Sequence, residues 1–578
     1  MAHDEDFQLR PGRIRSRGEQ RARPFVAQAL AAAQRAGGQV TRGRVTAPRA
    51  SRFGRGRSAS IRANHLLSTR SREVVVKARV VRMAARGASL ATHLSYLRRE
   101  GVTRDGEKAR MFGADTDAAD HAAFARRCEE DRHHFRFIVS PDDAADLADL
   151  RRFGRELMEQ MQADLGTRLD WVAVDHWNTA HPHLHILVRG KGDDGRDLII
   201  ARDYIATGLR ARAQDLVTQE LGPCTDLDIR QTLERQVEAE RWTRLDRALA
   251  RQMDSQGVID TAPVPGERPD DFLPLKIGRL RKLEGLGLAR QLAQGQWTLS
   301  PTAEATLREL GERGDIIKRI HQGLAAGGIE RAAASYVLAG EALADPVIGR
   351  LVARGLDDEL RGSAFAVIDG VDGRTHHVRL ADLDAAGDSP AGSIVELRRY
   401  EDGQGRRRVT LSVRSDLDIA GQVTADGATW LDRQLLARDP PALGSGGFGA
   451  EVKNALAART DHLLAAGLAR REGDRVLYAR GLLDRLRRQD LERTGARLAA
   501  GTGLSRSEPI VGDGLAGIYR QRLDLASGRF AMIDDGLGFS LVPWVPSLEK
   551  QLSRHVTGIV RTDGGVDWAL GRKRGLGI

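Results

Sequence analysis

Four histidines within ten residues are the feature of this sequence with the clearest chemical meaning. The run His-Trp-Asn-Thr-Ala-His-Pro-His-Leu-His contains His176, His181, His183 and His185, out of 15 histidines in 578 residues. In a β-strand, residues i and i+2 face the same side, so His183 and His185 project together while Leu184 points the other way. An upstream strand ending at His176 would bring in a third imidazole. Three converging imidazoles indicate a metal site with open positions for substrate oxygens; the alternatives are a structural zinc site or a surface histidine cluster.

The surrounding sequence predicts the elements that must position these histidines. Alternating apolar residues predict four strands, at 73–81, His134–Ser140, Trp171–Trp177 and His183–Arg189. Helical periodicity predicts helices at Ala91–Glu100, 142–164 and Tyr204–Leu221. This order predicts an α+β domain with an antiparallel sheet and flanking helices, spanning about 72–225.

The histidine row resembles the HUH motif (His, hydrophobic residue, His) of mobilization nucleases, in particular the P-type pattern H-x-D-x-x-x-x-H-x-H. The resemblance implies that His176, His183 and His185 are the metal ligands and that His181 is a supporting residue. It also implies a divalent cofactor, Mg²⁺ or Mn²⁺, although three neutral imidazoles would also accept Zn²⁺. Asn178 stands where the pattern has Asp, and an amide can orient a partner by hydrogen bonding but cannot accept a proton.

The same resemblance implies a tyrosine nucleophile, and the chain has six tyrosines. Tyr96, in His-Leu-Ser-Tyr-Leu-Arg-Arg-Glu-Gly, lies in a segment similar to the Y-L-x-R-x-G of P-type relaxases. The basic pair beside it, Arg98 and Arg99, is expected to contact DNA. Tyr204 opens a helix after the histidines, as the tyrosine of rolling-circle replication initiators in the same superfamily does. Chain order allows either residue, and the motif favours Tyr96.

Charge and cysteine content limit the class of protein. The formal net charge is +11, and within residues 1–80 Lys and Arg outnumber Asp and Glu by 18 to 5. We therefore expect residues 1–71 to be a basic, mostly disordered arm that binds a polyanion. Cys128 and Cys224 are too few and too far apart for a disulfide framework or a thiolate zinc site, which fits a reducing cytoplasm. Apolar runs are too short for a membrane span, and the N-terminus lacks a secretory signal.

The second half of the sequence repeats itself. Lys282–Leu299 and Asp461–Tyr478 share Gly-Leu-Ala-Arg between a helix and a short apolar strand, a pattern that resembles a winged helix. Phe365–Asp369 and Phe530–Asp534 recur downstream, at the start of what we expect to be small β-barrels. We predict a helical connector at 226–265, followed by a winged-helix-like unit at 266–340 and a small barrel-like unit at 341–420. A second winged-helix-like unit at 421–505 and a second barrel-like unit at 506–578, which ends in a basic tail, complete the chain.

A nuclease domain before a duplicated region resembles the Ti-plasmid relaxase type and the large relaxases of integrative and conjugative elements. The resemblance implies a conjugative relaxase that nicks one strand at an origin of transfer, forms a 5′-phosphotyrosyl adduct and later rejoins the strand. One alternative is an HUH replication initiator or transposase-like nuclease using Tyr204, whose helicase-bearing form is disfavoured because no Walker P-loop is present. Another is a DNA-binding scaffold in which the histidines are structural.

The relaxase interpretation carries expectations about partners and location. The DNA partner would be a single-stranded origin of transfer in a supercoiled plasmid or an excised element. The protein partners would be a type IV coupling protein, the secretion channel and accessory relaxosome proteins. The protein is expected in the bacterial cytoplasm, without membrane insertion, and in a recipient cell after transfer with its bound strand.

Overall fold

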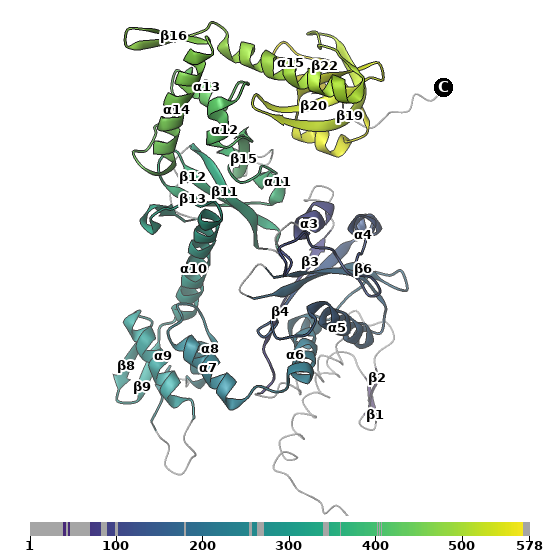
Figure 1. The fold of residues 1–578 in the computed structure, drawn as a ribbon. Helices are drawn as coiled ribbons and strands as arrows, with labels where there is room; N and C mark the ends of the chain where they lie inside the picture. The colour runs from purple at the N-terminus through teal and green to yellow at the C-terminus, as the bar shows by residue number, and fades with distance from the viewer. Residues whose placement is uncertain are drawn as a thin grey trace, which may run out of the picture. The chain divides into compact units, whose positions relative to one another are not determined.

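The computed structural model divides the chain into two compact units (Figure 1). The first comprises Met1–Glu238, Ile259–Leu283 and Gln294–Gln296, and the second comprises Ala239–Val258, Glu284–Ala293 and Trp297–Ile578. The described residues are 39–41, 44–46, 70–82, 90–98, 102–177, 181–253, 257–262, 271–338, 346–358, 360–401, 403, 405 and 407–569. No helix in these ranges is both long and apolar enough to cross a membrane.

A four-stranded antiparallel sheet forms the centre of the first unit, as predicted. Its strand order is β3-β4-β6-β5, and its strands are β3 (Val74–Arg82), β4 (His133–Pro141), β5 (Leu169–His176) and β6 (His183–Gly192). The helices α5 (Leu150–Leu165) and α6 (Leu209–Leu221) cover one face, and α3 (Leu90–Leu97) and α4 (His121–Cys128) lie on the other (Figure 1). The domain is therefore a helix–sheet–helix sandwich.

The period-two pattern of the central strands produces the core between the sheet and α5. Leu184, Ile186 and Val188 alternate along β6, and each is at most 1% exposed in the cluster that includes the apolar face of α5. Gly154 allows α5 to approach this strand closely, because a Cβ there would meet Leu184 Cδ1 at 2.8 Å. Since Leu184 points into this core, its two neighbours in sequence must face the opposite side of the sheet.

One predicted helix starts later in the structure, and another starts where predicted but with a different helix type. The helix expected from residue 142 begins at Leu150, because the Asp149 side chain accepts a hydrogen bond from Arg151 N and caps the helix there. The helix expected from Tyr204 begins as a π-helix, η1 (Tyr204–Gly208), which continues into α6. Of the predicted disordered arm, the described residues form one antiparallel hairpin, β1 (Gln39–Thr41) with β2 (Arg44–Thr46); its other residues up to 69 lie outside the described part.

The predicted connector is helical over α7 (Asp226–Val237) and α8 (Arg244–Gln252). Each helix begins with a capping box, in which Thr225 or Thr243 exchanges hydrogen bonds with the Asp three residues later. The next elements in the chain are β7 (Ile259–Asp260), α9 (Leu273–Gly285), β8 (Ala289–Ala293), β9 (Gln296–Leu299) and α10 (Ala303–Ala326).

Two six-stranded sheets in the second unit share one strand order. The first runs β10-β13-β12-β11-β14-β15, and the second runs β18-β21-β20-β19-β22-β23. In each sheet one edge pair is parallel (β10 with β13, β18 with β21) and the other pairs are antiparallel. The strands are β10 (Tyr336–Val337), β11 (Val347–Asp358), β12 (Ser363–Gly370), β13 (Thr375–Leu380), β14 (Ile394–Glu401), β15 (Arg407–Ser415), β18 (Ser505–Arg506), β19 (Gly514–Leu525), β20 (Gly528–Asp534), β21 (Gly538–Pro543), β22 (His555–Val560) and β23 (Val566–Trp568).

The equivalence of the two sheets extends to single residues. Gly349 and Gly517 occupy matching positions, since a Cβ at either would collide with a carbonyl oxygen, of Asp369 or Asp534 respectively. Both long strands also carry a register shift two residues later, after Leu351 in β11 and after Tyr519 in β19. The predicted duplication is therefore visible in strand order, in register and in the positions where only glycine fits.

Helices and a hairpin lie between the two sheets in the chain. They are α12 (Ile419–Thr424), α13 (Trp430–Leu435), α14 (Gly447–Ala465), β16 (Ala469–Glu472), β17 (Arg475–Tyr478) and α15 (Leu482–Thr502), while the short helix α11 (Leu383–Ala386) lies earlier, between β13 and β14. Arg459 of α14 is fully buried and forms a two-pronged ion pair with the fully buried Asp432 of α13, with both N–O distances 2.8 Å. The order helix, hairpin, helix matches α9, β8, β9 and α10.

Candidate metal centre

Sheet pairing brings the three predicted ligands together on one face. His176 at the end of β5 lies opposite His183 at the start of β6, and Val174 lies opposite His185. The three imidazoles are 0%, 7% and 3% exposed for His176, His183 and His185. One nitrogen from each lies within 4.8 Å of the others, and among the described residues no other such group of three metal-ligand side chains occurs.

The distances within the triad suit a shared divalent cation. Ring centroids are separated by 5.4 Å (His176 to His183), 4.4 Å (His176 to His185) and 4.9 Å (His183 to His185). Nε2 of His183 lies 3.1 Å from Nε2 of His185. Two imidazole nitrogens bound at about 2.0–2.1 Å to one ion would lie about 3.0–3.4 Å apart. The donor set therefore fits a transition-type divalent ion with coordination positions left for oxygen ligands.

Backbone carbonyls fix the orientation of two of the rings. Nε2 of His176 donates to the Leu97 carbonyl at 2.7 Å, and Nδ1 of His183 donates to the His181 carbonyl at 2.9 Å. A ring N–H held by a carbonyl leaves the lone pair on the other nitrogen, as in most metal-bound histidines. His181, predicted as a supporting residue, thus contacts the His183 ring through its backbone carbonyl, while its side chain is exposed.

The Leu97 carbonyl also places the end of α3 against the triad. Tyr96, which precedes Leu97, is half-buried at this end of the helix. Arg98 follows the helix, and its Nη1 lies 2.8 Å and 2.7 Å from the two ring nitrogens of His121 in α4. Burial and the nearby Arg98 charge lower the pKa of His121. Two other predicted site residues, Arg99 and Asn178, lie outside the described residues.

Tyr204 lies in a different environment. Its side chain is 1% exposed within the core between the sheet and α5, on the face opposite the histidines. Its hydroxyl donates to Asp164 Oδ2 at 3.0 Å, and the same carboxylate accepts two hydrogen bonds from Arg212 at 2.9 Å. Burial, together with the Asp164 charge, raises the pKa of the Tyr204 phenol. The structure therefore keeps this hydroxyl protonated and away from solvent.

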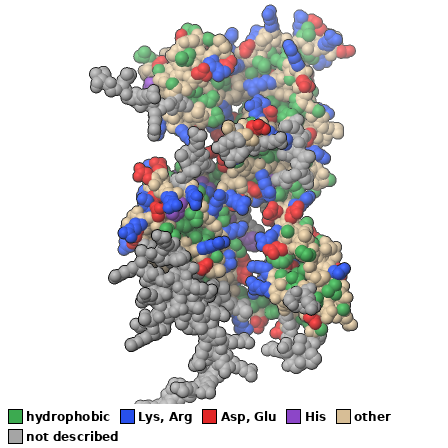
Figure 2. All heavy atoms as spheres, turned by 180° about the vertical axis from the view of Figure 1, so that it is seen from behind, with side chains coloured by type: hydrophobic (Ala, Val, Ile, Leu, Met, Phe, Trp, Pro, Cys, Tyr) green, Lys and Arg blue, Asp and Glu red, His purple; other side chains and the backbone are tan. Residues whose placement is uncertain are grey.

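Basic residues that the sequence analysis did not single out share the histidine face. Ile138 of β4 lies opposite His185, and Arg136 is two residues earlier on the same side of the strand. The next strand places Lys77 opposite Ile138 and Arg79 opposite Arg136. Figure 2 shows Lys and Arg side chains gathered beside histidine on the described surface of this domain. Their alternation along β3 and β4 is the signal that would have identified them.

Two further basic groups lie near the triad: the buried Arg136, and Arg104, which contacts the Trp177 ring. Burial, with Arg79 nearby, lowers the pKa of Arg136 to about 10. Its Nε donates to His134 Nε2 at 3.0 Å, and burial lowers the pKa of that imidazole to about 3. At Trp177, the residue after His176, the Arg104 guanidinium lies 5.2 Å from the centroid of the indole ring. A cation stacked on an indole next to His176 gives this edge of the site both charge and an aromatic surface.

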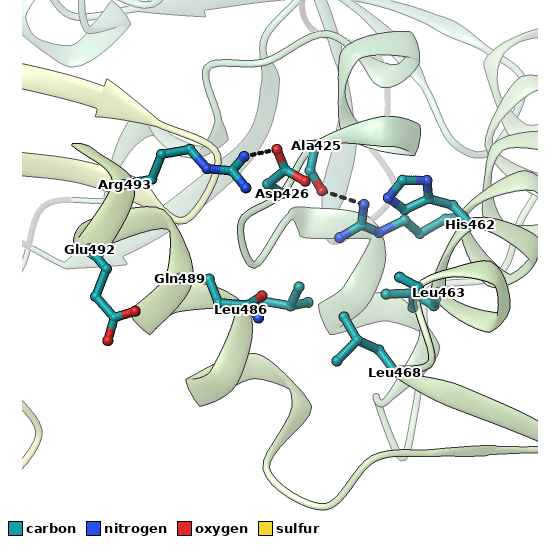
Figure 3. Close-up of a pocket in the computed structure, with 11 residues that line it drawn as sticks. Ala425, Asp426, His462, Leu463, Leu468, Leu486, Gln489, Glu492 and Arg493 are labelled. Atoms are coloured by element: carbon teal, nitrogen blue, oxygen red, sulfur yellow. Dashed lines mark hydrogen bonds and ion pairs between the residues drawn. The ribbon is translucent and has the colours of Figure 1, made fainter. Parts of the chain in front are cut away.

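A hollow in the second unit is of a different kind. It encloses about 570 Å³ between α14 and α15 (Figure 3). His462 reaches it from α14, and Glu492 and Arg493 line it from α15, with Arg493 paired to Asp426. Its lining mixes leucines with charged side chains and brings no three metal ligands together. The histidine triad is therefore the better candidate for catalysis.

Two family models match separate parts of the chain. A family described as MobA/VirD2-like relaxase, nuclease domain, matches residues 103–207, which include all three triad histidines but not Tyr96. A family described as protein of unknown function (DUF3363) matches twice, at 276–406 and 396–577. No curated protein and no solved structure matches the chain. Since the two DUF3363 matches together span more than half of the sequence, the chain belongs to the DUF3363 family, as a relaxase with a MobA/VirD2-like nuclease domain before a duplicated C-terminal region.

Proposed function

We propose that this protein is a conjugative relaxase that nicks one DNA strand at an origin of transfer, using Tyr96 as the nucleophile. The observation that carries the proposal is the meeting of three buried imidazoles on the sheet face against which the Tyr96 helix ends. The 2.7 Å hydrogen bond from His176 to the Leu97 carbonyl joins the two parts. Tyr96 itself lies outside the matched nuclease region, so its role rests on this geometry and on its sequence motif.

The reaction is a transesterification. The Tyr96 oxygen forms a bond to the scissile phosphorus, the bond from phosphorus to the 3′ oxygen breaks, and the proton lost by the phenol is balanced by one gained at the 3′ oxygen. The product is a 5′-phosphotyrosyl bond and a free 3′-hydroxyl. Because one phosphodiester replaces another, the strand can be rejoined later without ATP. That property suits transfer and religation of a strand better than degradation.

The triad is proposed to hold Mg²⁺ or Mn²⁺, with Zn²⁺ as an alternative for three imidazoles. A bound divalent ion would supply positive charge to the non-bridging phosphate oxygens. Arg98 and Arg99, with the basic side chains of β3 and β4, would hold the DNA backbone close to Tyr96. Asn178 is proposed to orient a partner by hydrogen bonding, and His181 to fix the His183 ring through its carbonyl.

The burial of Tyr204 supports the choice of Tyr96. A replication initiator or transposase-like nuclease using Tyr204 would need that hydroxyl to leave Asp164 and cross from the opposite side of the sheet. The half-buried Tyr96 needs no such movement to meet a phosphate. A scaffold with structural histidines would not need a ligand set with coordination positions left open, and this favours the enzyme over the scaffold.

The wider role follows from the family and stays a proposal. The DNA substrate would be a plasmid or an excised element, and the protein partners would be a type IV coupling protein, its secretion channel and relaxosome proteins. The protein would act in the bacterial cytoplasm before transfer with its strand. We further propose that the helix–hairpin–helix segments are winged-helix units and that the two sheets are barrel-like.

Adduct formation on a denaturing gel tests the nicking proposal. Purified protein, MnCl₂ and single-stranded origin-of-transfer DNA should give a covalent protein–DNA band. Tyr96→Phe should abolish the band, while Tyr204→Phe should retain it and serve as the matched control. His183→Ala should reduce the band although Tyr96 is intact. Loss with Tyr204→Phe but not with Tyr96→Phe would transfer the nucleophile to Tyr204, and no adduct under any metal would favour the scaffold.

A further inference from the structure

The two sheets of the duplicated region differ most at one hairpin. β14 and β15 pair from Ile394 opposite Ser415 to Glu401 opposite Arg407. The equivalent strands β22 and β23 pair only from Gly558 opposite Trp568 to Val560 opposite Val566. The β14–β15 hairpin is therefore longer than the β22–β23 hairpin. We call its outer part, residues 398–401 with 407–410, the extension.

The extension combines arginines with an exposed aromatic ring. Tyr400 is 51% exposed, and it is the one aromatic side chain in the described ranges that the structure leaves exposed. It lies directly opposite Arg408, and Arg398 is two residues earlier on the same side of β14. Among the described residues, the acidic side chain on this face is Glu396, which is paired with Arg414. The described part of this face therefore carries more arginines than acidic side chains.

This face is also hollowed. A groove of about 560 Å³ runs along it, lined by Glu396, Arg398, Tyr400, Thr410 and Ser412 of this face, and also by Leu397 and Arg399 of the other side of β14 and by Pro346. The opposite side of the hairpin base carries Leu397, which is 2% exposed and belongs to the sheet interior. Burial of one side and exposure of the other mean that Tyr400 stabilises no core and that its ring is available to a ligand.

We propose that the Tyr400 face of the β14–β15 hairpin is a binding site for single-stranded DNA, separate from the nuclease site. An exposed aromatic ring offers a stacking surface to an unpaired base, and flanking arginines bind the phosphates on either side. A duplex hides the faces of its bases, so the ring contributes to single-strand binding alone. At the equivalent register of the second sheet, Ile559 replaces Arg398, and the Arg561 that follows β22 is paired with Asp563 and Asp567. The site is therefore specific to the first repeat.

Fluorescence anisotropy on the full chain tests this proposal. The probes are labelled (dT)20 and a duplex of equal length, in EDTA so that no strand is cut. Tyr400→Ala should weaken (dT)20 binding about tenfold, and Tyr400→Phe, which keeps the ring, should bind within about twofold of wild type. Replacing Arg398 and Arg408 together by Ala should reduce the salt slope for (dT)20 by about 1.4, at about 0.7 for each phosphate contact. The matched control Arg561→Ala should leave (dT)20 binding unchanged.

A second measurement keeps the other DNA-binding parts of the chain from masking the result. Photo-crosslinking to a 5-bromouracil oligonucleotide should yield a modified peptide containing Tyr400. Unchanged (dT)20 affinity in Tyr400→Ala, or crosslinks confined to other segments, would overturn the proposal. An equal loss on the duplex would overturn the single-strand assignment. Since neither readout involves cleavage, the result is independent of the nicking proposal.

Discussion

Replacing Tyr204 by Phe separates the two candidate tyrosines by stability as well as by activity. The change removes one oxygen, whose hydrogen bond to Asp164 is 3.0 Å long. Asp164 keeps two hydrogen bonds from Arg212, so the carboxylate is not left without a partner. A hydrogen bond to a charged group contributes about 1.5–3 kcal/mol to stability. Because the ring stays buried in Tyr204→Phe, we expect the free energy of unfolding to fall by an amount near the lower limit, about 1–2 kcal/mol. Tyr96→Phe, at a half-buried position, is the comparison variant.

The assay must resolve one domain within a multidomain chain, where a single unfolding transition is not defined. Hydrogen exchange followed by mass spectrometry does so, because it reports the opening free energy of each segment. Peptides from β4, β6 and α5 should lose about 1–2 kcal/mol of protection in Tyr204→Phe. Peptides from the two six-stranded sheets should be unchanged and serve as the internal control. Adduct yield at 25 °C should equal that of wild type.

The stability difference between wild type and Tyr204→Phe should depend on pH in a defined direction. Burial raises the pKa of Tyr204 above its ordinary value in the folded protein. The unfolded chain ionises this phenol near pH 10, so the stability it contributes is complete below about pH 10 and is lost as pH rises further. The advantage of wild type over Tyr204→Phe should therefore shrink above about pH 10. Unchanged protection together with loss of the adduct in Tyr204→Phe would refute the reasoning, since that residue would then be catalytic and not structural.

Two further predictions test the histidine site, and a third tests the buried ion pair of the second unit. Leu184→Ala should lower the free energy of unfolding of the nuclease domain by about 3 kcal/mol, measured by hydrogen exchange. It should also weaken Mn²⁺ binding in titration calorimetry, because the cavity would lie beneath His183 and His185. Mn²⁺ at about 100 times its dissociation constant should stabilise the nuclease domain by about 2.7 kcal/mol, and EDTA or His183→Ala should remove that gain. Arg459→Met should reduce protection of α13 and α14 by about 3–5 kcal/mol, because it leaves Asp432 charged and buried; a loss below about 1 kcal/mol would contradict this.

The part of the site that local geometry decides was predictable from the sequence. Period two along a strand fixes which residues share a face, so the pairing of His183 with His185 needed only the strand assignment. The antiparallel sheet then placed His176 opposite His183, as the order of elements implied. The duplicated region was also visible in the sequence, because the motifs around Phe365 and Phe530 recur at matching points of two sheets that share one strand order.

What depends on packing between distant segments was not predictable. The contact between Leu97 and His176 joins residues 79 positions apart, and nothing in either segment specifies the other. In the sequence Tyr204 looks like an ordinary residue at the start of a helix. Only the packing of α5 beside it shows that its hydroxyl donates a hydrogen bond to Asp164. Arg459 resembles a surface arginine in sequence, yet it is fully buried with five hydrogen bonds to Asp432 and to nearby carbonyls. Such residues acquire their roles from partners that only the fold brings near.

The two copies of the C-terminal region show where this fold is constrained and where it is free. Gly349 and Gly517 are fixed because another strand's carbonyl occupies the space of a side chain. Arg398 and Ile559 lie at the same register yet differ in charge, and both side chains are exposed. A duplicated scaffold can therefore keep one architecture while each copy presents a different surface. Of the two copies, the first alone combines arginines with an exposed aromatic ring on its longer hairpin, so the surface that we propose for a single strand belongs to one copy of a shared scaffold.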